Sequence, residues 1–190
     1  HTLYFKALAP IKFDFARYEY IYHMNQAIVF SPSRIAGFLA LNKYWPRVAW
    51  ELEQAKLDLD ETAFRVILED GGHGEGPGYY SAVIYYMLCS YLLWARYKGV
   101  PPQDLVPPAL AHSADYYGTF VSTSTKAGRL PLSDGGTTAL APDWIAMLAH
   151  VTGDPRWTKM LAESLTTDLE EIINRPTSGS WLTYDVRTLI

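Results

Sequence analysis

The sequence predicts an all-α protein. Segment after segment places apolar residues at helical spacing, and almost no stretch alternates strictly between apolar and polar residues as a half-buried strand does. Proline, glycine and capping residues separate these segments by short connections, which is typical of antiparallel helical hairpins. With 49% hydrophobic and 19% charged residues, the 190-residue chain has enough apolar side chain to bury a core, and we expect a single domain over residues 1–190.

The first half of the chain predicts five helices and one glycine-rich loop. Pro32 is expected to interrupt the first helix, and Ser33 to cap the second. Pro46 is expected to open the third, and Asp60 to cap the fourth. Five glycines within residues 70–78 predict a loop. The expected helices span residues 13–30, 35–41, 46–57, 60–68 and 79–97.

The second half follows the same pattern. Gly99 is expected to end the helix that precedes it, and prolines frame a short turn before the next helix. A long loop is expected over residues 123–138, and Trp181–Tyr184 is expected to be an extended segment. The predicted helices span residues 109–121, 142–150 and 154–173.

Composition excludes several classes of function. A formal net charge of -4 argues against a general nucleic-acid binder, which needs a basic surface. No uncharged apolar run reaches 18 residues, so no membrane span is expected. The five histidines lack metal-ligand spacing, so no dedicated zinc site is predicted, and the single cysteine, Cys89, is predicted to be buried and inert. Fourteen tyrosines favour a half-wet concave surface that stacks on ligands.

The glycine-rich loop carries the polar residues of most interest, His73, Glu75 and Tyr79. Its spacing does not match a phosphate-binding loop, because neither the preceding strand nor the lysine of those motifs is present. A backbone of glycines can approach a ligand closely. A purely structural interpretation stays open, in which Glu75 caps the following helix and His73 is simply exposed.

The stretch Asp70–Tyr79 resembles the D-G-[SG]-x-x-E-G-x-x-Y motif of the heparinase II/III-like and alginate-lyase-like polysaccharide lyases, a family that includes the uronyl C5-epimerase of dermatan sulfate synthesis. Those proteins place an Asn somewhat more than fifty residues before the Tyr, and here Asn25 stands 54 residues before Tyr79. Many relatives have His after the Asn, whereas this chain has Gln26. A third, Asp-containing loop of the family is similar to the sequence around Asp134.

The resemblance implies both a fold and an activity. The fold is an α/α-toroid of helical hairpins followed by a β-sandwich, and since no β-sandwich pattern is present here, we expect this chain to be part of a longer protein. The implied activity is β-elimination on an anionic polysaccharide that contains uronic acid, without a cofactor, in a secreted or periplasmic setting. Asn25 would neutralise the substrate carboxylate and Tyr79 would act as base, acid or both. The other expected site residues are Gln26, His73, Glu75, Tyr80 and Asp134.

The chemistry leaves alternatives open. A tyrosine has an ordinary pKa of about 10, so a base role for Tyr79 requires a neighbouring cationic or hydrogen-bonding group, for which His73 or an arginine is a candidate. An epimerase would share the proton abstraction at C5. Glu75 and Asp134 are alternatively the paired carboxylates of an α/α-toroid glycoside hydrolase. A carbohydrate-binding domain without turnover is the non-enzymatic alternative.

Overall fold

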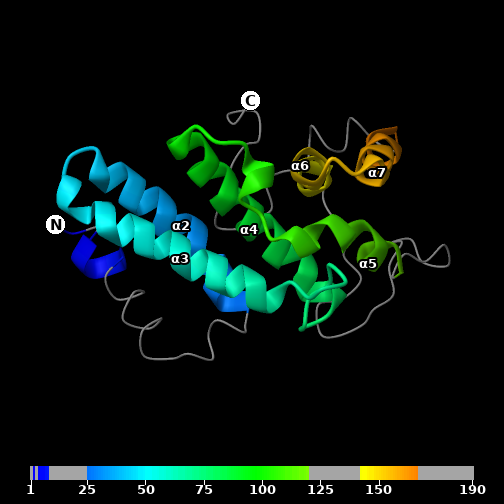
Figure 1. Cartoon of the computed structure of the whole chain (residues 1–190), viewed down its shortest axis with the longest axis horizontal. Helices are drawn as coiled ribbons and strands as arrows, with labels where there is room; N and C mark the ends of the chain where they lie inside the picture. The colour runs from blue at the N-terminus through cyan, green and yellow to red at the C-terminus, as the bar shows by residue number, and fades with distance from the viewer. Residues whose placement is uncertain (1, 3, 9–24, 120–141, 167–190) are drawn as a thin grey trace. The chain divides into compact units, whose positions relative to one another are not determined.

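The computed structural model describes residues 2, 4–8, 25–119 and 142–166 (Figure 1). These residues are mostly helical and include no strand, which confirms the all-α prediction; an isolated antiparallel bridge joins Ile67 to His73. Within the described part of the chain, no helix is long and apolar enough to cross a membrane. The toroid arrangement of the hairpins stays a prediction.

The chain divides into two compact units, His1–Ala139 and Leu140–Ile190, and the prediction of a single domain stays a prediction. In the first unit the helices are η1 (Tyr4–Leu8), α2 (Asn25–Asn42), η3 (Pro46–Val48), α3 (Ala49–Val66), α4 (Pro77–Lys98), η4 (Pro102–Asp104), η5 (Pro108–His112) and α5 (Ser113–Thr119). In the second unit they are α6 (Pro142–Thr152) and α7 (Pro155–Thr166), which pack against each other.

Helices α2, α3 and α4 form an up-down-up group in the first unit (Figure 1). The Asn42 amide donates to the Tyr97 hydroxyl (3.4 Å), which joins the C-terminal ends of α2 and α4. The Lys98 ammonium pairs with Glu53 (2.6 Å), which joins the end of α4 to the beginning of α3. Helices α2 and α4 therefore run parallel, while α3 runs antiparallel to both.

Pro32 does not interrupt the helix as predicted. Helix α2 runs through it, and Pro32 is itself buried. The buried positions Ile28, Ile35 and Phe38 recur on the face that packs against α3 and α4, and this tertiary packing outweighs the backbone hydrogen bond that proline cannot donate. Ser33 lies inside α2 and is exposed, so it caps nothing.

Asp60 is also misplaced by the prediction, because it lies inside a continuous α3 and does not cap a new helix. Its carboxylate accepts hydrogen bonds from Lys56 (2.6 and 2.7 Å) and from the Tyr91 hydroxyl of α4 (3.0 Å). An acidic residue is neutral to unfavourable in a helix interior unless its side chain finds such partners. These partners, which a capping rule does not take into account, explain why Asp60 lies inside the helix.

The remaining predictions within the described residues hold in part. Helix α4 covers the predicted 79–97 segment, and Gly99 ends it in the left-handed conformation (φ +68°). The predicted helix over 109–121 is instead a 3-10 helix followed by α5. Cys89 is buried, as predicted. The predicted loop over 123–138 and the segment Trp181–Tyr184 lie outside the described residues.

Candidate functional site

The glycine-rich loop between α3 and α4 folds as a tight turn. The Gly71 backbone N–H donates to the Leu68 carbonyl (2.9 Å), and the Leu68 N–H donates to the Gly72 carbonyl (2.9 Å). The Asp70 carboxylate accepts a hydrogen bond from the Gly72 N–H (2.9 Å). Gly71 has φ +77°, a conformation that residues with a side chain rarely adopt. The local sequence therefore needs a glycine at this position.

Close packing against the beginning of α5 adds a second requirement for glycine. A Cβ at Gly71 would collide with the Ser113 backbone nitrogen, and one at Gly72 would lie 2.5 Å from the Tyr116 ring. A Cβ at Gly74, by contrast, would meet nothing within 4 Å. The first two glycines thus fix the loop against α5, whereas Gly74 has room for a side chain.

Asn25 and Glu75, two of the predicted site residues, are joined directly. The Asn25 backbone N–H donates to Glu75 Oε2 (2.8 Å), and its Nδ2 donates to Oε1 (3.1 Å). Asn25 is the first described residue of α2, and the Glu75 carboxylate accepts hydrogen bonds from both its backbone and its side chain. Glu75 therefore bonds to α2 and does not cap α4, the helix that follows it, as the structural interpretation expected.

His73 is buried directly beside this pair. Its Nδ1 accepts a hydrogen bond from the Glu75 backbone N–H (3.2 Å), so in the neutral ring the proton is on Nε2. Nε2 lies 3.9 Å from Glu75 Oε2 and has no hydrogen-bond partner among the described residues. Burial lowers the pKa of His73 to about 4. His73 is thus neither exposed, as the structural interpretation expected, nor cationic near pH 7, and its role as a hydrogen-bonding group for Tyr79 stays a prediction.

The two tyrosines that begin α4 differ in their surroundings. Tyr79 is half-buried in the first turn, four residues after Glu75. Tyr80 is fully buried, and its ring lies 5.2 Å from that of Tyr116 and 6.4 Å from that of Tyr117. Burial raises the pKa of Tyr80 well above its ordinary value, an effect that the nearby Ser113 hydroxyl opposes. Tyr80 accordingly packs in the core, which does not suit the predicted contact with substrate.

The other predicted site residues contribute less. Gln26 is exposed on the second position of α2, next to Asn25. Asp134 lies outside the described residues, so the carboxylate pair that it was predicted to form with Glu75 stays a prediction. Among the described residues, no group of three histidine, cysteine, aspartate or glutamate side chains is arranged to hold a metal ion.

A polar cluster in the middle of α3 was missed by the sequence analysis. Arg34 of α2 forms a buried ion pair with Asp58 (2.7 Å), and Lys56 pairs with Asp60 (2.6 Å). The Lys56 ammonium also lies 5.1 Å from the centre of the Tyr91 ring. The four-residue spacing of Lys56 and Asp60 is a signal that sequence reasoning can use. The Arg34–Asp58 pair carries no such signal because it joins two helices.

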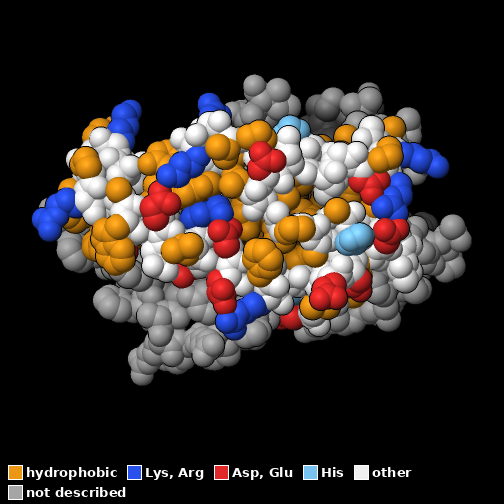
Figure 2. Space-filling view, viewed as in Figure 1, with side chains coloured by type: hydrophobic (Ala, Val, Ile, Leu, Met, Phe, Trp, Pro, Cys, Tyr) orange, Lys and Arg blue, Asp and Glu red, His pale blue; other side chains and the backbone are white. Residues whose placement is uncertain are grey.

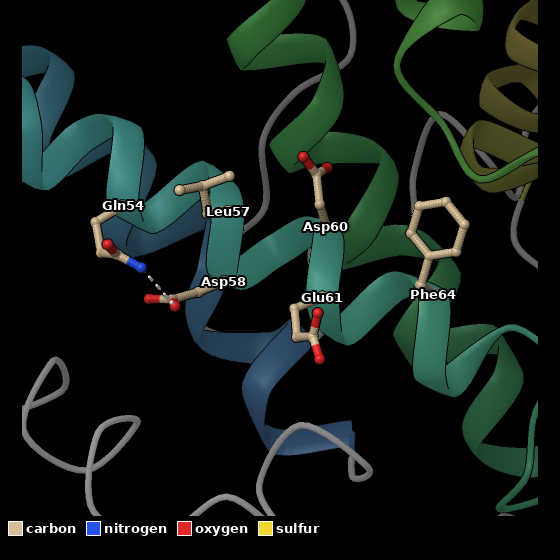
Figure 3. Close-up of a pocket in the computed structure, with 6 residues that line it drawn as sticks. All are labelled: Gln54, Leu57, Asp58, Asp60, Glu61 and Phe64. Carbon is tan, nitrogen blue, oxygen red and sulfur yellow. Dashed lines mark hydrogen bonds between the residues drawn. The ribbon is translucent and has the colours of Figure 1, made fainter.

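A shallow pocket of about 410 Å³ opens beside this cluster (Figure 3). All the residues that line it come from α3, namely Gln54, Leu57, Asp58, Asp60, Glu61 and Phe64. The pocket is separate from the Asn25–Glu75 pair, and no predicted site residue lines it.

Comparisons of this chain with protein-family models, with curated proteins and with solved structures give no match.

Proposed function

We propose that the beginning of α2 and the glycine-rich loop form the substrate site of a polysaccharide lyase that acts on a uronic-acid-containing polymer. The observation that carries the proposal is the pair of hydrogen bonds between Asn25 and Glu75 (2.8 and 3.1 Å). These bonds hold the Asn25 carboxamide beside the loop that leads into Tyr79. Two residue types that β-elimination needs, an amide donor and a proton-transferring phenol, therefore lie at the same end of the parallel helices α2 and α4.

Asn25 is suited to recognise the uronate carboxylate. A carboxamide has two N–H donors, and the bond to Glu75 uses one and fixes the orientation of the group. The second N–H, which has no partner among the described residues, would donate to the substrate. The beginning of α4 follows the same loop, and its helix dipole favours negative charge. Together they would stabilise the enolate-like charge that develops when the proton at C5 is removed, as an oxyanion hole does.

Tyr79 is the proposed proton-transfer residue. Its phenolate would accept the C5 proton, the electron pair would form the C4–C5 double bond as the C4–O bond breaks, and the phenol would return the proton to the leaving oxygen. Atoms and charge balance, and no oxidant or cofactor is consumed. Because His73 is neutral near pH 7, the positive potential in this proposal comes from the beginning of α4.

The test is incubation of the protein with alginate, heparan, chondroitin and hyaluronan while the ultraviolet absorbance of the unsaturated product is followed. We expect absorbance to rise with at least one polymer, and no rise with any of them would refute the lyase. Deuterium incorporation at C5 without cleavage would identify an epimerase instead. Reducing ends without the double bond would identify a hydrolase, and binding without either product a carbohydrate-binding domain.

A pair of tyrosine variants tests the role of Tyr79. Tyr79→Phe removes only the hydroxyl, and we expect turnover to fall about a thousandfold, in the range of general acid–base contributions, with polymer binding retained. Tyr97→Phe is the matched control, because Tyr97 is exposed at the opposite end of α4. Full activity of Tyr79→Phe would exclude Tyr79 from the chemistry.

A further inference from the structure

The exposed side of α3 carries large apolar side chains at intervals of seven residues. Trp50, Leu57 and Phe64, here called the α3 stripe, are 58%, 60% and 69% exposed. Residues seven apart lie almost in line along a helix, as in the seam of a coiled coil. Figure 2 shows the face on which hydrophobic side chains are interspersed with charged ones. Large exposed apolar groups in one line are typical of a binding surface.

The α3 pocket has the geometry that receives a side chain from a second helix. Leu57, Asp60, Glu61 and Phe64 stand at positions i, i+3, i+4 and i+7, and they line the same pocket (Figure 3). Four residues at this spacing form the hole that accepts one knob in helix-into-helix packing. The pattern favours a helical partner, since an extended peptide would not repeat contacts every seven residues.

The charges of the pocket indicate which side chain of a partner helix would fit into it. The charged residues that line it are three carboxylates, Asp58, Asp60 and Glu61, and none of the lining residues is cationic. Each carboxylate has a cationic partner within the chain, but a carboxylate has about four acceptor sites. A lysine or arginine would place its apolar stem between Leu57 and Phe64 and its charged end at the oxygens of Asp60 and Glu61, since Asp58 is buried.

The same charges disfavour a second copy of this chain as the occupant. In an antiparallel pair of α3 helices centred on Leu57, Glu53 would face Glu61 of the other copy. In a parallel pair in register, Asp60 and Glu61 would each face themselves. Like charges placed opposite each other oppose association.

We propose that the α3 stripe and its pocket bind an amphipathic helix with apolar residues at heptad spacing and a lysine or arginine as the knob between Leu57 and Phe64. The proposal is independent of the lyase activity, because the two sites share no residue.

The test uses two synthetic peptides of about 20 residues, long enough to form a helix on binding. Both carry leucines at heptad spacing, and they differ only in lysine or glutamate at the flanking positions. Fluorescence anisotropy of labelled peptides is expected to show that the full-length protein binds the lysine peptide at least about tenfold more tightly, with the preference declining as salt is added. No binding of the lysine peptide, or equal affinity for both, would overturn the proposal.

Variants of exposed residues locate the binding surface without disturbing the core. Leu57→Ser and Phe64→Ser are each expected to weaken lysine-peptide binding about tenfold, whereas Tyr44→Ser, at a residue 80% exposed outside the stripe, should leave it unchanged. Glu61→Lys should reverse the preference toward the glutamate peptide. Equal loss in the Tyr44 control would overturn the assignment. So would a dimer, seen by sedimentation, that dissociates in Phe64→Ser, because the occupant would then be a second copy.

Discussion

Two regions of the first unit hold polar side chains in or near the core. The hydrogen-bond and charge partners of those side chains differ between the two regions. In the middle of α3, buried Asp58 is opposed by Arg34, and Asp60 by Lys56 and the Tyr91 hydroxyl. At the glycine-rich loop, Glu75 is held by neutral N–H donors.

The loop also contains a buried polar atom without a hydrogen-bond partner among the described residues. The buried His73 Nε2 has no hydrogen-bond partner among the described residues, although it lies 3.9 Å from Glu75 Oε2. Buried polar groups in folded proteins are nearly always satisfied, so exceptions call for a physical explanation. The ion pairs of the α3 cluster hold α2 to α3 by pairing opposite charges, whereas the glycine-rich loop holds Glu75 with neutral donors.

The largest effect is expected from breaking the ion pair inside the α3 region. Arg34→Met leaves Asp58 buried opposite an apolar side chain, and the free energy of unfolding should fall by about 3–5 kcal/mol. Urea denaturation measures the loss. The double variant Arg34→Met with Asp58→Leu removes both charges and should recover much of the stability. A loss below about 1 kcal/mol in the single variant would show that the pair is not essential to the packing of α2 on α3.

The next largest effect is expected in the loop, where the backbone and not charge is decisive. Gly71→Ala must tolerate φ +77° and a Cβ that collides with the Ser113 backbone nitrogen, and it should lose about 3 kcal/mol of unfolding free energy. Gly74→Ala is the matched control, because nothing lies within 4 Å of its Cβ, and it should change stability by less than about 0.5 kcal/mol. Equal effects in both variants would contradict the close packing of the loop on α5.

A smaller effect is expected from pH, and its sign follows from the burial of His73. In the unfolded chain His73 takes up a proton near pH 6.5, whereas in the folded protein its pKa is about 4. Between these values the unfolded state binds more protons than the folded state. The stability that comes from keeping His73 neutral and buried is therefore complete above pH 6.5 and is lost as pH falls toward 4. The loss should be on the order of 2–3 kcal/mol.

Urea denaturation of wild type and His73→Gln between those pH values isolates this contribution, because other acidic groups titrate in both proteins. The variant should lose less stability than wild type on acidification. His112→Gln is the control, since His112 is exposed, and it should follow wild type. Identical acid sensitivity of wild type and His73→Gln would contradict the burial of a neutral His73.

Sequence reasoning recovered the helical class and the glycine loop, because periodicity and glycine content are local signals. It failed at Pro32 and Asp60, where contacts with α4 and neighbouring turns override local preferences. It named Asn25 and Glu75 separately, but not the bond between them, because residues 50 positions apart meet only after α2 and α4 pack. It missed the Arg34–Asp58 pair for the same reason.

The smallest expected effect concerns the hydrogen bonds between Asn25 and Glu75. It tests most directly how the loop differs from the α3 region. Glu75→Gln keeps the size of the side chain but places an N–H group opposite a donor of Asn25, so we expect a loss of about 1–2 kcal/mol of unfolding free energy. Glu69→Gln, at an exposed glutamate just before the loop, should have no measurable effect.

A double-mutant cycle with Asn25→Ala separates a direct bond from a general disturbance of the loop. If the two side chains interact as described, the effects of Glu75→Gln and Asn25→Ala are not additive, and the coupling energy is about 1 kcal/mol. Additive losses would mean that Glu75 does not hold the beginning of α2 to the loop. The Asn25 carboxamide would then lack the fixed orientation on which recognition of a substrate carboxylate depends, even if each variant alone is destabilised.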